Sequence, residues 1–362
     1  MTDELDLLRK RVAEIDEDIA AFVAKRLQAV AEIGRLKGEQ RIPVRDERVE
    51  AQVVQRLETA GRRHGLSDIF ARDLARALIE ESVRVQDASV RPPPDDAGRR
   101  ILIVGGAGRM GSWLARYFRG QSERVVINDI AGPLDGFLFA PDLAPAVRDA
   151  DVIVVATSMS AAAGVLRSVT ARRPAGLVFD ICSLKAPVSE ALLEAAGAGL
   201  RVASVHPMFG PNVASLAGRN ILFCDCGNRE ALEAATDLFR GTGANLEEVP
   251  LDRHDTLMAR VLGLSHAANI AFFGALARGG VAMADLRDAS STSFTRQVAT
   301  AREVANENPD LYLEIQTLNP HTPEVVRDLE AALAELRDVV ARRDEEAFRS
   351  LMESGRRYFG GD

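Results

Sequence analysis

The feature that most constrains the fold is a heptad-like pattern over residues 4–38. Apolar residues recur there every three or four positions, which predicts one long amphipathic helix that stops near Pro43. With Leu5 in heptad position a, the a positions are residues 5, 12, 19, 26 and 33, and all of them except Arg26 are Leu, Val or Ile. A cation therefore stands where the pattern demands an apolar side chain.

Two more cations, Arg9 and Lys37, border the same apolar edge. Burying a lone guanidinium is costly, so Arg26 should face an anion. For Arg26 alone, a structural ion pair or a side chain that reaches solvent is the better explanation. Three cations along one edge make a site for an anionic ligand a competing explanation. Arg9 is about 26 Å from Arg26 along a straight helix, so we expect Arg9 to come from a second chain in an antiparallel dimer. Lys37 is about 16 Å from Arg26, and its long side chain can lean toward it.

Two shorter helices are expected to follow the first. One begins after Asp46 and runs to about Arg62, and the other runs from about Ser67 to about Gln86. Residues 91–98 are rich in proline and acidic side chains, which indicates a linker. Residues 1–90 are therefore expected to form an all-α domain.

Composition limits the kinds of partner. The chain has 362 residues, of which 47% are hydrophobic and 27% charged, so two or three soluble domains are expected. A net charge of −8 without a long basic run argues against nucleic acid, and no apolar run approaches the ~20 residues that span a bilayer. The N-terminus is charged, with no apolar signal segment. The three cysteines have neither disulfide nor zinc spacing, so we expect a cytoplasmic protein without a metal site.

From residue 99 the pattern becomes that of an α/β domain. Short apolar strands alternate with helical or loop stretches, which predicts a parallel sheet with strands near residues 101–105, 124–129, 151–157, 176–183, 201–206 and 221–225. From about Leu251 the pattern is helical to the end. The predicted fold is multidomain: an all-α helical domain, an α/β Rossmann dinucleotide-binding domain over 99–250, and an all-α domain over 251–362.

A glycine-rich loop follows the first strand of this domain and fits the GxGxxG spacing. Gly106 is expected to allow a tight turn, Gly108 a close approach of the backbone to a pyrophosphate, and Gly111 close packing of helix on strand. Asp129 ends the next strand, where its carboxylate would accept from ribose hydroxyls and repel a 2′-phosphate, so NAD is favoured over NADP. The expected cofactor site comprises Gly106, Gly108, Arg109, Met110, Gly111 and Asp129.

A histidine, His206, ends one of the predicted strands. Ligands of open α/β sheets bind at the carboxyl ends of the strands, although a histidine bonded within a core turn is a fair alternative for this residue alone. Ser183 ends the preceding strand, and His266 and Arg296 lie in later helical segments. A helix cap or a salt bridge explains Lys185 and His254 at least as well, and His64 and His321 are expected to have no role in the site.

The segments LLRKRVAEID, AKRLQAVAEIGRLK, PVRDERVE and IEESVRVQ resemble the all-helical chorismate mutase family across residues 1–90. Members of that family bind the dicarboxylate chorismate in an intertwined helical dimer and rearrange it to prephenate. The resemblance implies that arginines hold the two carboxylates, that Lys37 and Gln86 donate to the breaking ether oxygen, and that Glu50 accepts from the ring hydroxyl. The implied site comprises Arg9 of the other protomer with Arg26, Lys37, Asp46, Glu50, Ser82 and Gln86.

One position departs from that family. Its members usually carry an adjacent Arg-Glu pair in the second helix, whereas Val49 precedes Glu50 in this chain. The nearest arginine is Arg48, one place earlier. Either Arg48 replaces the usual arginine in binding substrate, or that contact is missing.

Residues 100–320 resemble prephenate dehydrogenase in four places. These are HPMFGP, DICSLK, the pair HD with a second histidine twelve residues later, and SFTR. The resemblance implies that His206 accepts the proton of the substrate's 4-hydroxyl as hydride leaves C4 for NAD, and that loss of CO2 yields 4-hydroxyphenylpyruvate. Ser183 would orient the hydroxyl, Arg296 would pair with a carboxylate, and His266 would bind substrate. The C-terminal helices would dimerise. The family more often has a histidine near residue 263, where this chain has Gly263.

Together the two resemblances imply a bifunctional chorismate mutase/prephenate dehydrogenase of tyrosine biosynthesis that acts as a homodimer. Three alternatives use similar residues. The first is a pair of activities of secondary metabolism on 4-amino-4-deoxychorismate and 4-amino-4-deoxyprephenate. The second is an arogenate dehydrogenase. The third is a mutase-like domain that only senses a carboxylate. The intact pair of donors, Lys37 and Gln86, argues against this third alternative.

Overall fold

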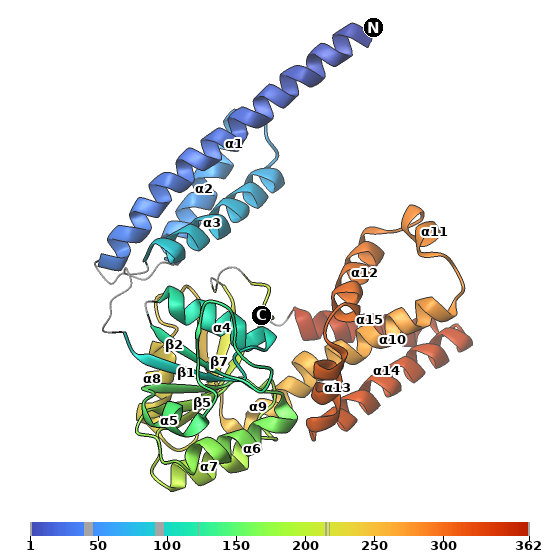
Figure 1. Ribbon diagram of the computed structural model, residues 1–362. Coiled ribbons are helices and arrows are strands. Elements are labelled where there is room, and N and C mark those ends of the chain that lie inside the picture. The colour runs from blue at the N-terminus through green and yellow to red at the C-terminus, as the bar shows by residue number, and fades with distance from the viewer. Residues whose placement is uncertain are drawn as a thin grey trace. The chain divides into compact units, whose positions relative to one another are not determined.

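The computed structural model describes residues 2–39, 46–90, 98–121, 123–213, 216 and 218–360 (Figure 1). The chain divides into two compact units. The first comprises residues 1–157, 161–182 and 191–249, which include the N-terminal helices and the sheet. The second comprises residues 158–160, 183–190 and 250–362, so it adds two short loops to the C-terminal helices.

The N-terminal region consists of the three predicted helices, α1 (Thr2–Glu39), α2 (Glu47–Arg63) and α3 (Asp68–Val90). Asp46 begins α2 as its N-cap, because its carboxylate accepts from the N–H groups of Arg48 at 3.0 Å and Val49 at 3.3 Å. Helix α3 packs against both α1 and α2. A small core joins α2 to α3, and it comprises Val53, Ile79 and Val83 with Val54 and Leu57 beside them.

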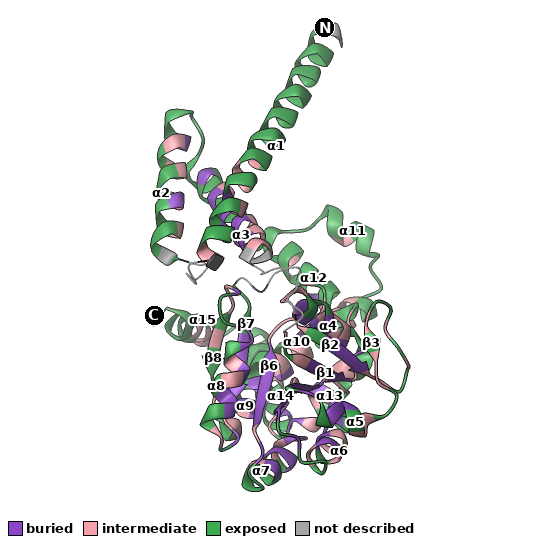
Figure 2. Ribbon diagram, turned by 60° about the vertical axis from the view of Figure 1, so that its left-hand side comes forward, coloured by how far each residue is buried: buried purple, intermediate pink, exposed green. Residues whose placement is uncertain are grey.

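The first half of α1 extends beyond α2 and α3 (Figures 1 and 2). Its apolar edge is 49% to 69% exposed at Leu5, Leu8, Val12, Ile15, Ile19 and Phe22. The same helix becomes buried only later, at Val30, which is 8% exposed. A contiguous apolar stripe of this kind is typical of a surface that another chain covers.

The α/β region contains one eight-stranded sheet in the order β3-β2-β1-β4-β5-β6-β7-β8. Strands β1 to β6 are parallel, β7 is antiparallel to β6, and β8 is parallel to β7. All six predicted strands are present, whereas β3 has only two residues and β8 is polar, so neither was predicted. The strands are β1 (Arg100–Val104), β2 (Arg124–Asn128), β3 (Leu138–Phe139), β4 (Val152–Val155), β5 (Leu177–Asp180), β6 (Val202–Pro207), β7 (Asn220–Cys224) and β8 (Asn245–Glu248).

Helices cover the sheet on both faces (Figure 1). The buried core of one face joins strand residues to side chains of α4 and α8, while α6 and α7 lie on the other face. The strand order reverses between β1 and β4, and open α/β sheets bind their ligands at the carboxyl ends of the strands at such a point. The helices are α4 (Arg109–Gly120), α5 (Leu143–Arg148), α6 (Met159–Thr170), α7 (Ser189–Gly197) and α8 (Arg229–Asp237).

The C-terminal region is helical from Leu251, as predicted. Its first three elements form one continuous helix, Leu251–Arg278, which is long and apolar enough to cross a membrane by length and composition alone. That finding differs from the expectation that no apolar stretch has such a length. The elements are α9 (Leu251–Met258), a π-helix η1 (Ala259–Leu264), α10 (Ser265–Arg278), α11 (Met283–Asp288), α12 (Thr292–Ala305), α13 (Pro309–Leu318), α14 (Thr322–Arg342) and α15 (Glu345–Phe359).

Candidate active sites

Arg26, the cation in the apolar edge of α1, is half-buried and turns toward α3. Its Nη1 donates to the hydroxyl of Ser82 at 2.5 Å and to the carbonyl of Leu78 at 3.2 Å. Burial lowers the pKa of Arg26, and the positive charge of Arg56 lowers it further. Within the described residues no ion pair joins Arg26 to a carboxylate. The guanidinium therefore faces the interior of the helical region beside a second predicted site residue.

Gln86 lies at the closest approach of α1 and α3. A Cβ atom on Gly34 would lie 2.7 Å from Cα and 2.9 Å from the carbonyl oxygen of Gln86, so only glycine fits there. The Gln86 side chain is 8% exposed, its Nε2 donates to the carbonyl of Ser82 at 3.3 Å, and its buried Oε1 has no hydrogen-bond partner among the described residues. Gly34 thus places a buried amide beside Ser82. Sequence reasoning missed Gly34, although a glycine inside a helix signals close packing.

The other predicted mutase residues are arranged differently. Lys37 and Glu50 are half-buried, as expected of groups that face a site. Arg48 is exposed and stands about 160° around α2 from Glu50, given 100° per residue. Arg9 is exposed in the first half of α1 and pairs with Asp6 at 3.2 Å. The structure therefore brings Arg26, Ser82 and Gln86 together, whereas Asp46 caps α2 and Arg9 stays apart from them in its own chain.

The glycine-rich loop joins β1 to α4 as predicted, but the turn is made by a different glycine. Gly105 has the positive φ, +85°, whereas Gly106 is confined because a Cβ there would lie 2.5 Å from Cδ1 of Ile127. A Cβ on Gly111 would lie 2.1 Å from the carbonyl oxygen of Gly105, so α4 packs closely on the loop, whereas the prediction was close packing on the strand. Gly108 precedes α4 as its N-cap.

The start of α4 fits an anionic ligand. Gly108 has no side chain to cap the helix, so the first N–H groups of α4, beginning at Arg109 and Met110, suit a pyrophosphate. Asp129 follows β2, and its carboxylate accepts from the N–H of Ala107 at 2.9 Å and of Ala131 at 2.8 Å. Asp129 therefore holds the glycine-rich loop. Its carboxylate oxygens keep further acceptor capacity for a ribose hydroxyl.

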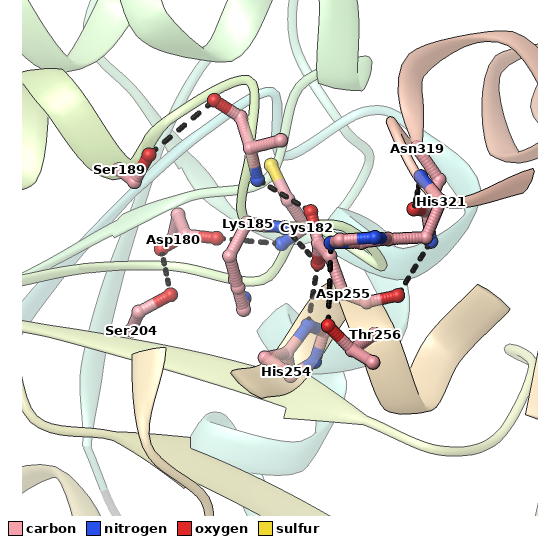
Figure 3. A network of polar contacts seen from close by, with 11 residues as sticks. Asp180, Cys182, Lys185, Ser189, Ser204, His254, Asp255, Thr256, Asn319 and His321 are labelled. Carbon is pink, nitrogen blue, oxygen red and sulfur yellow. Dashed lines mark hydrogen bonds and ion pairs between the residues drawn. The ribbon is translucent and has the colours of Figure 1, made fainter. Parts of the chain in front are cut away.

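His206 is the penultimate residue of β6 and is 3% exposed. It lies opposite Leu222 of the antiparallel strand β7. Two residues earlier, the hydroxyl of Ser204 donates to Asp180 at the end of β5, at 2.6 Å, and the second oxygen of Asp180 accepts from the N–H of Cys182 at 2.8 Å. This fully buried carboxylate, which was not predicted, ties the end of β5 to Ser204 in the middle of β6 (Figure 3).

In the second unit, Asp255 holds the loop that carries Ser183 (Figure 3). Its carboxylate accepts from the N–H groups of Lys185 at 2.8 Å and Ala186 at 2.6 Å, and it bonds Nδ1 of His254 at 2.7 Å. Burial alone would raise the pKa of Asp255, but the hydrogen bonds from His254 and from the two N–H groups outweigh it and lower that pKa. Sequence reasoning did not assign Asp255, although the HD pair was visible.

The histidines and the lysine with weaker claims are bonded within the protein. His254 and Lys185 are buried, at 0% and 1% exposed, and His254 bonds Asp255, in line with a structural role. His321 contacts the hydroxyl of Thr256 through Nε2 at 3.2 Å. His64 is the exposed C-cap of α2.

His266 lies half-buried on α10, with its ring stacked on Tyr312 at 4.1 Å between centroids. Burial lowers the pKa of His266, which favours the neutral ring, and in the part of the chain that the structure describes its buried Nδ1 has no hydrogen-bond partner. Arg296 is exposed on α12, and no hydrogen bond among the described residues joins it to His266. The face of α12 that packs on α10 carries Phe294 and Gln297 instead.

The π-helix η1 separates His254 from His266, and sequence reasoning did not anticipate it. Its wider turn shifts every later side chain around the helix axis, so it sets the direction in which His266 points. The amide of Gln316 donates to the carbonyl of Gly263 at 3.0 Å and so satisfies a group of the irregular turn. A Cβ on Gly263 would lie 3.3 Å from Oγ1 of Thr322, so the departure from the family at this position is accommodated by packing against α14.

The helical region and the sheet define two kinds of site, one for a small anion among helices and one for a dinucleotide in an α/β domain. Residues 8–87 match the type II chorismate mutase family, 136–248 the nucleotide-binding domain of prephenate dehydrogenase, and 250–354 its dimerization domain. The chain is also 30% identical over 278 residues to a 4-amino-4-deoxyprephenate dehydrogenase of Streptomyces pristinaespiralis, which covers 72% of this chain and 91% of that protein. It belongs to the prephenate dehydrogenase family and carries a chorismate mutase domain in front.

Other relatives extend this result. The T-protein of Enterobacter agglomerans is 24% identical over 360 residues, which cover 99% of this chain and 94% of the relative. A probable arogenate/prephenate dehydrogenase of Methanocaldococcus jannaschii is 27% identical over 273 residues, which are 72% of this chain and 61% of that longer protein. The crystal structure of prephenate dehydrogenase from A. aeolicus with hydroxyphenyl propionate and NAD+ shares the fold, with a TM-score of 0.59 at 19% identity over 74% of this chain and 99% of that one.

Proposed function

We propose that the protein rearranges chorismate to prephenate and then converts prephenate to 4-hydroxyphenylpyruvate by NAD-dependent oxidative decarboxylation. The observation that carries the proposal is the inward guanidinium of Arg26 beside Ser82 and Gln86, in a chain whose remainder matches the prephenate dehydrogenase domains. The product of one site is then the substrate of the other. The likeness to T-proteins along nearly the whole chain supports this pair over the secondary-metabolism and arogenate alternatives.

In the mutase site, the protein acts by holding a flexible substrate in its reactive chair form. The rearrangement is unimolecular and needs no covalent catalyst, so positioning and charge stabilisation suffice. Arg26 binds one carboxylate and Arg9 of the partner subunit binds the other. Lys37 and the buried amide of Gln86 stabilise the negative charge that develops on the ether oxygen, and Glu50 accepts from the ring hydroxyl.

In the dehydrogenase site, His206 accepts the proton of the 4-hydroxyl while C4 loses a hydride and becomes a carbonyl carbon. NAD+, when bound, takes up that hydride. The ring carboxylate then leaves as CO2, its bonding electrons complete the aromatic ring, and the former carbonyl oxygen regains a proton. Ser183 orients the hydroxyl, and His266 and Arg296 bind the substrate's polar groups. The loop from Gly105 to Gly111 and Asp129 hold the dinucleotide.

The exposed apolar surfaces support a homodimer. The first half of α1 leaves its apolar edge open, and pairing it with a second copy would bring Arg9 to the partner's site. A hollow of about 280 Å³ between α10 and α12, lined by Phe272, Leu276 and Met283 among others, lies in the region that matches the dimerization domain. Dimer burial accounts for the apolar helix 251–278 without a membrane. The three cysteines are buried and lack disulfide spacing, in agreement with a reducing cytoplasm.

One assay tests both activities. Purified protein receives chorismate and NAD+, and chorismate loss, NADH and the mass of the product are followed; 4-hydroxyphenylpyruvate is expected. Arg26→Ala should abolish chorismate loss but keep NADH formation from added prephenate. His206→Asn should do the reverse, with dehydrogenase turnover lower by about three orders of magnitude or more, as for loss of a general base. Wild-type protein that oxidises only arogenate or 4-amino-4-deoxyprephenate would refute the proposed substrate.

A further inference from the structure

The mutase site lacks one cation that related sites carry, and α2 offers a replacement at another position. Val49, which occupies the place of the missing arginine, is 50% exposed. Arg56 lies seven residues further along α2, which is two turns, so its side chain leaves the helix within about 20° of that of Val49. Arg48 does not share this face, since it stands about 100° from Val49.

Packing places Arg56 near Arg26. Val53, one turn before Arg56, is buried against Ile79 and Val83 of α3. That stretch of α3 also contains Leu78 and Ser82, the two residues to which the guanidinium of Arg26 donates. Arg56 therefore borders the region of α3 on which Arg26 rests.

The charges at this place are unbalanced. Arg56 is close enough for its positive charge to lower the pKa of Arg26, after the larger effect of burial. Among the described residues, neither guanidinium forms an ion pair with a carboxylate. Arg26 is half-buried and Arg56 is exposed, and two like charges this close repel each other unless an anion binds between them.

We propose that Arg56 is a substrate-binding residue of the mutase site and that it shares a carboxylate of chorismate with Arg26. In this arrangement Arg56 takes over the role of the arginine that is absent at position 49. The inference rests on the proposed mutase function.

The test compares Arg56→Leu with wild type in the full-length protein. The KM for chorismate should rise about 10-fold to 100-fold, the effect of one charge-assisted hydrogen bond, and NADH formation from prephenate should be unchanged. Arg56→Lys, which keeps the charge, should lose less. Arg62→Leu is the matched control, because Arg62 is an exposed arginine of α2 that pairs with Asp68. Adding Val49→Arg to Arg56→Leu should restore much of the loss.

Two outcomes overturn the inference. The first is a wild-type KM in Arg56→Leu. The second is a loss confined to Arg48→Leu, which would make Arg48 the replacement. Calorimetry with a bicyclic dicarboxylate that mimics the chair transition state separates this inference from the proposed function. If wild type binds the probe without mutase activity, the proposed function fails, and weaker binding by Arg56→Leu still supports the role of Arg56; if wild type does not bind the probe, both fail.

Discussion

Replacing Asp255 tests whether one buried carboxylate organises the loop that carries Ser183. Asp255→Ala leaves three donors without their acceptor: the N–H groups of Lys185 and Ala186, and Nδ1 of His254. An unsatisfied buried donor costs about 1–3 kcal/mol. Because water can reach part of the loop, we expect a loss of about 3–6 kcal/mol in the stability of the second unit, a large share of the roughly 5–15 kcal/mol typical of a domain.

A second variant separates charge from shape. Asp255→Asn keeps one acceptor oxygen but turns an NH2 group toward an N–H donor, so we expect about half of the loss. The folded-state pKa of Asp255 is lowered, so its contribution is present above the ordinary Asp pKa and is lost as pH falls through the folded value. The difference between wild type and Asp255→Asn should therefore shrink below about pH 4.

Urea unfolding and hydrogen exchange at the amides of Lys185 and Ala186 measure this effect in the full chain. Dehydrogenase kcat should fall together with amide protection, whereas mutase activity serves as an internal control because it resides in α1–α3. If Asp255→Ala unfolded within about 1 kcal/mol of wild type, below the cost of a single orphaned donor, with both amides still protected, the reasoning would be refuted.

Three further predictions concern other elements. Gly34→Ala should force α1 away from Gln86 and lower stability by about 1–3 kcal/mol. It should reduce mutase but not dehydrogenase turnover, and a mutase kcat equal to that of wild type would contradict the close approach. Asp129→Ala should raise the ratio of kcat/KM for NADP to that for NAD, while affinity for both falls because the bond to the glycine loop is lost; a wild type that already prefers NADP would exclude this role. Burial lowers the pKa of His266, so the unfolded chain takes up a proton first and stability should decline as pH falls below about 6.5; His266→Phe should flatten this dependence in urea titrations at pH 7.5 and 5.5.

Several elements could be predicted because their signals are local. The apolar periodicity of α1, the start of α2 after Asp46 and the short apolar strands each depend on neighbours within a few residues, and the observed bounds agree with the predicted ones to within about four residues. The glycine-rich loop and Asp129 were recognised from spacing for the same reason. The strand β8 is polar and β3 has only two residues, so neither has the pattern of a strand; their place in the sheet comes from pairing with β7 and β2.

What the sequence by itself determined is therefore the order of helices and strands, the glycine-rich loop and the cation in the apolar edge of α1. The tertiary structure decided which groups meet: Arg26 with Ser82, Gln86 with Gly34, and Asp255 with the loop after β5. It also placed the positive φ at Gly105 and the π-helix η1 before His266. These features depend on contacts between residues that are far apart in the chain or on the exact path of the backbone, and neither leaves a periodic trace in the order of the amino acids.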